Sequence, residues 1–133
     1  MKQYTLDGSA FQTLEEFAAH FSDVVLGEHR WNGNLDALND ILRGGFGTPQ
    51  AGFEIVWENA SLSREALGYA ETVRQLEKRL STCHPKNASS VEVQIQKARS
   101  CTGPTVFDWI FEIIREHGKG GSESDDGVVL SLR

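Results

Sequence analysis

The sequence lacks any run of about 18 apolar residues that could cross a membrane, and it lacks a charged segment followed by an apolar one near its start. We therefore expect a cytoplasmic protein. The chain has 133 residues, of which 39% are hydrophobic and 24% charged, as is ordinary for a globular protein. A chain of this length can bury a hydrophobic core but is short for two separate domains, so we predict one domain over residues 1–133.

Cysteines are also scarce, with only Cys83 and Cys101 in the whole chain. Their spacing forms neither a C-x-x-C redox pair nor a zinc-binding set, even when His84 is counted as a further ligand. A disulfide across the intervening loop is geometrically feasible, but in a cytoplasmic chain we expect two reduced thiols. We assign no chemistry to either cysteine and expect no metal or cofactor.

Catalytic motifs are absent as well. The sequence contains neither H-E-x-x-H nor G-x-S-x-G. Glu16 and His20 share one helix face, a spacing far more typical of a surface pair than of an acid/base pair. The glycines in the segment 44–52 do not follow a predicted strand and do not precede a Lys-Ser/Thr pair, so they indicate a flexible connector and not a phosphate loop. We therefore do not expect an enzyme.

The net charge of −6 is unevenly distributed. Residues 1–42 hold seven acidic residues and two basic ones, whereas residues 64–99 hold seven basic and four acidic. An acidic front argues against nucleic acid as a direct ligand, because phosphates need clustered Lys and Arg. It fits a cationic protein partner, and it equally fits a solvated surface that keeps the protein soluble.

Three segments have the alternating pattern of a strand with one apolar face: 2–6, 53–58 and 128–132. Parallel strands that are covered on both sides usually read as unbroken apolar runs. These strands do not, so we predict a two-layer α/β fold in which the helices cover mainly one face of the sheet.

Helices are predicted between the strands. Thr13 begins the first with Glu16 as a capping-box partner, and Gly27 ends it. The segment 63–80 has helical periodicity, 83–90 is a turn, and 91–100 fits either a strand or a short helix. The most apolar helix, 105–117, has Thr105 and Asp108 at its start and forms the centre of the core. The polar segment 119–127 is predicted to be a flexible loop.

The short helix 35–42 divides its residues between two roles. Its apolar residues, Leu35, Leu38, Ile41 and Leu42, commit one side to the core, and Asn34 is placed to cap its start. Asp36 and Asp40 lie one turn apart on another side. Two like charges at this spacing cost roughly 0.2–0.5 kcal/mol, and a positively charged partner would remove that repulsion.

This helix resembles one in a known family. The segment L-D-A-L-N-D-I-L at 35–42, preceded by Trp31-Asn32-Gly33-Asn34 and followed by Gly44, is similar to the second helix of the barstar family of ribonuclease inhibitors. The order of the predicted elements is similar too. The resemblance is good over residues 2–59 and weaker over 105–132. It is absent over most of 60–103, which we interpret as a helical insertion that enlarges the second crossover.

The resemblance implies a three-stranded parallel sheet and an inhibitor or immunity protein of a toxin-antitoxin pair. Such a protein is a monomer that binds a basic ribonuclease one to one and occludes its active site with acidic side chains. On this basis Asp36 and Asp40 match the family's two acidic contacts, and Asp40 matches the one that reaches deepest. The contact surface would also include Asn39, Trp31, Arg30 and Gly44.

Several positions depart from the family pattern. Asn39 and Arg30 stand where the family has aromatic residues, although Trp31 is adjacent to Arg30. Gly45 stands at a further position where the family can have an aromatic residue. Ile113 replaces an acidic contact, with Glu112 and Glu116 as substitutes. Aromatic anchors often dominate interface energy, so these changes bear on which ribonuclease is bound. The alternative is a module of the same fold with a non-nuclease partner, contacted through the basic segment 64–99.

Overall fold

The fold is a single parallel β-sheet with helices packed on one of its faces, seen in a computed structural model that describes residues 1–133. The sheet has the order β1-β2-β3, with bounds β1 (Lys2–Asp7), β2 (Phe53–Glu58) and β3 (Val128–Leu132). Both pairings are parallel. The predicted strands and the α/β class are thus confirmed.

Six α-helices connect the strands: α1 (Leu14–Phe21), α2 (Leu35–Leu42), α3 (Ala60–Ala66), α4 (Tyr69–Thr82), α5 (Ala88–Arg99) and α6 (Val106–Glu116). A π-helical turn, η1 (Ser22–Leu26), continues α1 and ends at Gly27. There are also two short 3-10 helical turns, η2 (Pro85–Asn87) between α4 and α5 and η3 (Ser124–Asp126) between α6 and β3. None of the helices has the length and apolar character needed to cross a membrane.

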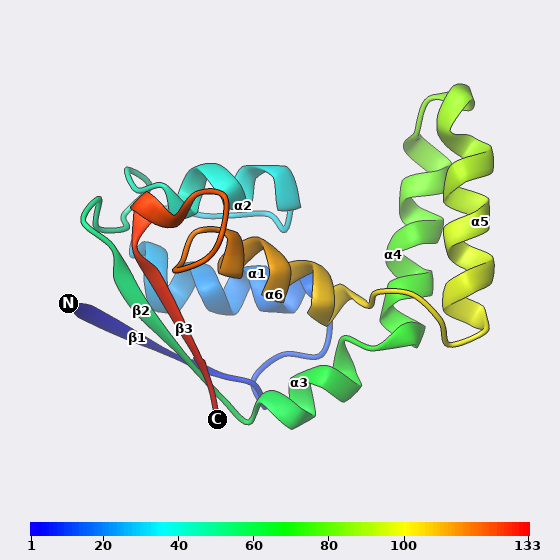
Figure 1. The fold of residues 1–133 in the computed structure, drawn as a ribbon. Helices are drawn as coiled ribbons and strands as arrows, with labels where there is room; N and C mark the ends of the chain where they lie inside the picture. Colours follow the sequence, from blue (N-terminus) through cyan, green and yellow to red (C-terminus); the bar gives the residue numbers. More distant parts are fainter.

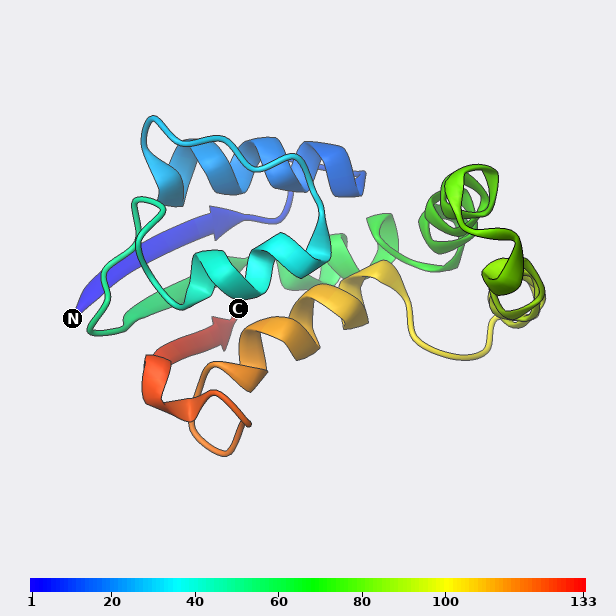
Figure 2. The same ribbon diagram turned by 90° about the horizontal axis from the view of Figure 1, so that it is seen from above.

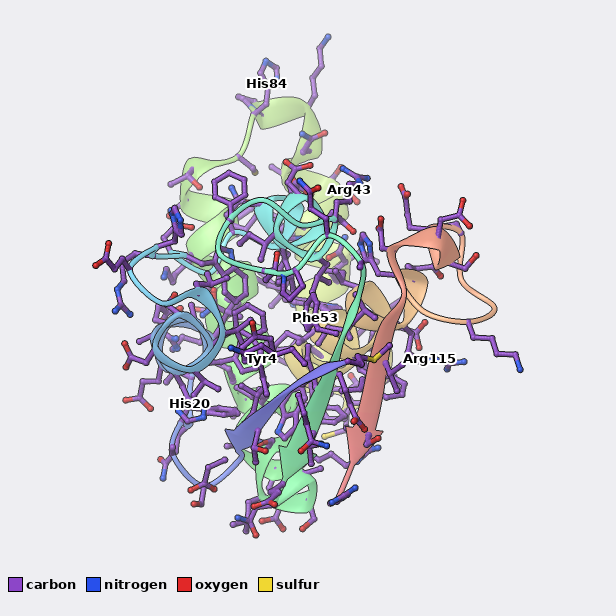
Figure 3. All side chains as sticks on the ribbon, turned by 90° about the vertical axis from the view of Figure 1, so that its left-hand side faces the viewer. Tyr4, His20, Arg43, Phe53, His84 and Arg115 are labelled. Carbon is purple, nitrogen blue, oxygen red and sulfur yellow. The ribbon has the colours of Figure 1, made fainter.

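Helices α1, α2 and α6 lie on one face of the sheet (Figures 1 and 2). This follows from the strand order, because right-handed crossovers that advance in one direction across a sheet place their helices on the same side. The inward side chains of the strands include Tyr4, Leu6, Phe53, Ile55 and Trp57. Figure 3 shows Tyr4 and Phe53 on the helix side of the sheet, with their rings 5.6 Å apart.

The predicted helix caps are present. Thr105 Oγ1 accepts a hydrogen bond from Asp108 N, and the Asp108 carboxylate accepts one from Thr105 N. Thr13 Oγ1 accepts from Glu16 N, but the Glu16 carboxylate accepts from Gln12 N, one residue before the position that a complete capping box requires.

The segment predicted as one helix, 63–80, is two. Helix α3 ends before Leu67, and α4 begins after Gly68, because the chain turns there to bury Leu67 completely. The ambiguous segment 91–100 is helical and belongs to α5. Val91 and Ile95, four residues apart, are buried, whereas Val93 is 54% exposed. The apolar residues at every second position, 91, 93 and 95, therefore do not mark a strand.

Helices α4 and α5 form a hairpin that projects from the rest of the molecule (Figures 1 and 2). The main core of 22 buried residues lies between the sheet and α1, α2 and α6, while the hairpin has its own small cluster of Leu76, Val91, Ile95 and Ala98. Trp109 on α6 packs against both clusters. The buried carboxylate of Glu71 on α4 accepts from Leu14 N, which ties the hairpin to the start of α1.

Candidate protein-binding site

The loop before α2 fixes the start of this helix. The side-chain oxygen of Asn34 accepts hydrogen bonds from the backbone N–H groups of Asp36 at 2.9 Å and Ala37 at 3.3 Å, which is the predicted N-cap. Trp31 Nε1 donates to the Asn34 carbonyl at 2.8 Å. The side chain of Asn34 therefore holds the first turn of α2, and the indole of Trp31 holds the backbone of Asn34.

Trp31 lies in the core and not on the contact surface that the resemblance implied. Only 6% of the residue is exposed, and its ring packs edge-on against Phe17 and Phe21 at centroid distances of 5.8 and 5.7 Å. The indole N–H of a buried Trp usually needs a hydrogen-bond partner, and the backbone carbonyl of Asn34 supplies it here. Trp31 positions α2 without being available to a partner.

Asp36 and Asp40 both point away from the core, while Leu38, Ile41 and Leu42 of the same helix are buried. The Asp36 carboxylate has no ion-pair partner. The Asp40 carboxylate, 66% exposed, accepts from Arg43 Nη1 at 2.7 Å. The two carboxylates are thus presented to solvent by a helix whose other side is fixed by packing.

Arg43 joins α2 to the segment before β3. Its Nη2 donates to the carboxylate of Glu123 at 2.9 Å while its Nη1 holds Asp40. The hydrogen bond and charge of Glu123, and then the charge of Asp40, raise the pKa of the guanidinium above its ordinary value. Figure 3 shows Arg43 beside α2 on the side facing the segment that leads to β3. Glu123 therefore adds a third carboxylate to the surface of Asp36 and Asp40, and we call these three residues the acidic surface.

Asn39 lies on α2 between the two aspartates, but its side chain turns toward α6. Its Oδ1 is 3.0 Å from Nε2 of His117, a residue with no exposed surface. The other ring nitrogen of His117, Nδ1, lies 2.6 Å from Asp126 Oδ2. This chain of contacts fixes α2 to the end of α6 and to η3.

The remaining predicted contact residues lie around this helix. Arg30 is exposed but forms an ion pair with Asp23, and it has no contact with the acidic surface. Gly44 follows α2 at a positive φ of 100°, and a Cβ there would come within 2.9 Å of Gln50 Cα, so only glycine fits. Phe46, 50% exposed, extends from the loop that Gly44 begins, and its ring lies 6.2 Å from that of His29.

Glu123, Asp126, His117 and Arg43 were missed as parts of this site. Arg43 could have been found from sequence, because it lies three residues after Asp40 on a helix. The contact between Glu123 and Arg43 could not have been found from sequence, since the two residues are 80 positions apart and meet only through the packing of α2 on α6. Neither Glu112 nor Glu116 hydrogen-bonds to α2; the Glu116 carboxylate accepts from Ser122 instead.

The exposed groups of this site are mainly carboxylates. No group of three or more His, Cys, Asp or Glu side chains is arranged to hold a metal ion. Cys83 and Cys101 are both free thiols. What the surface offers is exposed carboxylates on a rigid helix, an arrangement suited to a cationic partner.

Comparison with known families agrees with this geometry. A model of the barstar (barnase inhibitor) family matches residues 1–97. The chain belongs to the barstar family. The match includes all of α2 and its preceding loop, and it also covers α3, α4 and α5 as far as Lys97, which is most of the segment 60–103 interpreted as an insertion. Members of the barstar family are inhibitors whose partner in general is a ribonuclease. Neither the curated proteins nor the solved structures searched contain a match.

Proposed function

We propose that this barstar-family chain inhibits a basic ribonuclease by placing its acidic surface in the active site of that enzyme. The observation that carries the proposal is the exposure of Asp36 and Asp40 on α2, a helix fixed by its buried face, by Asn34 and by His117. Ribonuclease active sites bind phosphates through cationic side chains. Carboxylates held at fixed positions can satisfy the same cations without being cleaved.

The inhibitor acts by stoichiometric binding in this proposal. The rigid presentation of the carboxylates lowers the conformational entropy lost on association, because the helix and its cap are already formed. Opposite charges on the two proteins accelerate their encounter and orient it. The proposed assembly is one inhibitor to one ribonuclease, formed inside the cell as in an immunity protein of a toxin-antitoxin pair.

A direct test is to mix the purified protein with a panel of basic ribonucleases that includes any encoded beside its gene. Size-exclusion chromatography with light scattering would report a one-to-one complex, and a fluorogenic RNA substrate would report the loss of ribonuclease activity. We expect at least one member of the panel to be bound and inhibited. Absence of both complex and inhibition across the whole panel would refute the proposal.

The Asp40→Ala variant gives the sharper test. Removing one partner of a desolvated charge pair typically costs about 2–5 kcal/mol of binding free energy, mostly through a faster dissociation rate. The stability of the free protein should change little, because Asp40 is exposed and a carboxylate near the end of a helix is not favoured by the helix dipole.

Glu58→Ala is the matched control, since Glu58 is an exposed acid at the carboxyl end of β2 and no side-chain contact holds it. Surface plasmon resonance and thermal unfolding should be measured on all three proteins. A partner that binds wild type and Asp40→Ala equally would point instead to contact through the basic segment 64–99.

A further inference from the structure

A groove of about 810 Å³ separates the start of α2 from α4. One wall is formed by the loop 32–34 and the first turn of α2, including Asp36. The other wall is α4, from which Lys78, Arg79 and Thr82 face the groove, and Trp109 also lines it. Asp36 therefore belongs both to the acidic surface and to this groove, which makes the two regions continuous.

The α4 wall presents a cation that no carboxylate of this chain neutralises. The Arg79 guanidinium lies over the Trp109 ring at 5.4 Å from its centroid and forms no ion pair. By contrast Arg74, five residues earlier on α4, is paired with both Glu15 and Glu71. A guanidinium stacked on an indole is held flat and keeps its hydrogen-bond donors free, which suits two-pronged binding of a carboxylate.

The two walls differ in charge, and this restricts the occupant. Asp36, which has no ion-pair partner, would repel a free phosphate or nucleotide that approached Arg79, and Lys78 is already paired with Glu15 at 3.4 Å. A segment of protein that carries an acidic side chain beside basic ones can satisfy both walls at once. The groove opens next to the acidic surface, so the same ribonuclease that Asp40 contacts is placed to supply that segment.

We propose that the groove binds an acidic side chain from the rim of the ribonuclease, with Arg79 as its principal contact, and that the α4–α5 hairpin thereby contributes to the choice of partner. The inference rests on the proposed ribonuclease inhibition. It assigns the hairpin a role in specificity that the acidic surface alone does not supply, because many basic proteins can satisfy carboxylates but fewer also carry an acid at the required position.

The test uses the full-length protein and the ribonuclease of the panel that binds it. We expect Arg79→Glu to weaken the complex about tenfold or more, because it brings two carboxylates together. Arg79→Gln should weaken it less, since it removes the charge without adding repulsion. Lys97→Glu is the matched control: Lys97 is exposed on α5, outside the groove, and the substitution changes the net charge equally.

Circular dichroism and thermal unfolding would first establish that each variant is folded. Acid-to-arginine substitutions on the ribonuclease should then include one that restores binding to Arg79→Glu and not to wild type. Equal losses for Arg79→Glu and Lys97→Glu, or no loss for either, would overturn the groove proposal while leaving inhibition intact. Failure of the wild-type protein to bind any ribonuclease would remove both proposals.

Discussion

At the scale of single residues, Arg43 most directly affects how the acidic surface behaves. It pairs with Asp40 at 2.7 Å and with Glu123 at 2.9 Å, so the carboxylate proposed to reach deepest into a partner already has an internal counterion. A partner must displace Arg43 from Asp40 in order to use that carboxylate fully. Arg43 can stay paired with Glu123 after it leaves Asp40, which lowers the free energy needed to replace Arg43 by a cation of the partner.

Replacing Arg43 with Ala should therefore strengthen binding to a basic ribonuclease. We expect the association rate at low salt to rise about threefold to tenfold, because a positive charge is removed from the surface and Asp40 has no internal competitor. In a double-mutant cycle, Asp40→Ala should cost more in the Arg43→Ala background than in wild type.

Lys119→Ala is the control for this prediction, because it removes the same charge from another exposed position that forms no ion pair with Asp40. Stopped-flow fluorescence would measure the association rates. Slower association or weaker binding of Arg43→Ala would show that Arg43 itself contacts the partner.

At the scale of elements, α2 is held in place by a polar connection as well as by its apolar face. The connection runs from Asn39 through the buried His117 to Asp126, and so joins α2, the end of α6 and η3. His117 is fully buried, and Asn39 lies on α2 between Asp36 and Asp40. The orientation of the two carboxylates therefore depends on a residue inside the protein.

His117→Ala should lower the free energy of unfolding by roughly 2–3 kcal/mol, because it leaves the Asp126 carboxylate and the Asn39 amide without their partner. Asn39→Ala should lower it by about 1 kcal/mol, the usual net contribution of one hydrogen bond. His29→Ala, at an exposed histidine, is the control and should have little effect. Urea denaturation followed by tryptophan fluorescence measures all three, and an Asn39→Ala variant with unchanged stability but weakened binding would make Asn39 a contact residue instead.

Most elements were predictable from sequence because they rest on local signals. The caps at Asn34 and Thr105 and the alternation of β2 require only neighbours along the chain. The break between α3 and α4 was missed although Gly68 stands there, because a single glycine within a helical pattern does not always end a helix; the full burial of Leu67 accompanies the break. Glu123 was missed as part of the site because only tertiary packing brings it to Arg43.

At the scale of the whole molecule, the protein has two parts of unequal packing. The main core contains 22 buried residues, whereas the α4–α5 hairpin buries only four of its own, with Trp109 contacting both clusters. A helix with few buried apolar contacts opens more easily than a central strand. The hairpin should thus be the less protected part of the structure.

We expect hydrogen exchange to be faster in α5 than in β2 and α6. Ile95→Ala should accelerate exchange in the hairpin further while the sheet stays protected, because Ile95 belongs only to the small cluster. The comparison variant is Ile55→Ala, which removes a fully buried side chain of the central strand and should reduce protection throughout. Mass spectrometry of exchanged peptides distinguishes the two patterns, and a uniform loss of protection in Ile95→Ala would contradict this division.

The late position of β3 in the chain has a consequence for how the protein is made. Glu54 in the central strand meets Ser131 across 77 positions, so the sheet cannot be completed until residues 128–132 have left the ribosome. Helix α2 is synthesised early, but His117 and Asp126, which hold it through Asn39, come late. Parallel pairings over such separations form slowly. In the proposed role as an inhibitor, protection from the ribonuclease begins only after β3 has been made and has joined the sheet. A cell that starts to make both proteins at the same time therefore needs synthesis of the inhibitor to begin before that of the ribonuclease.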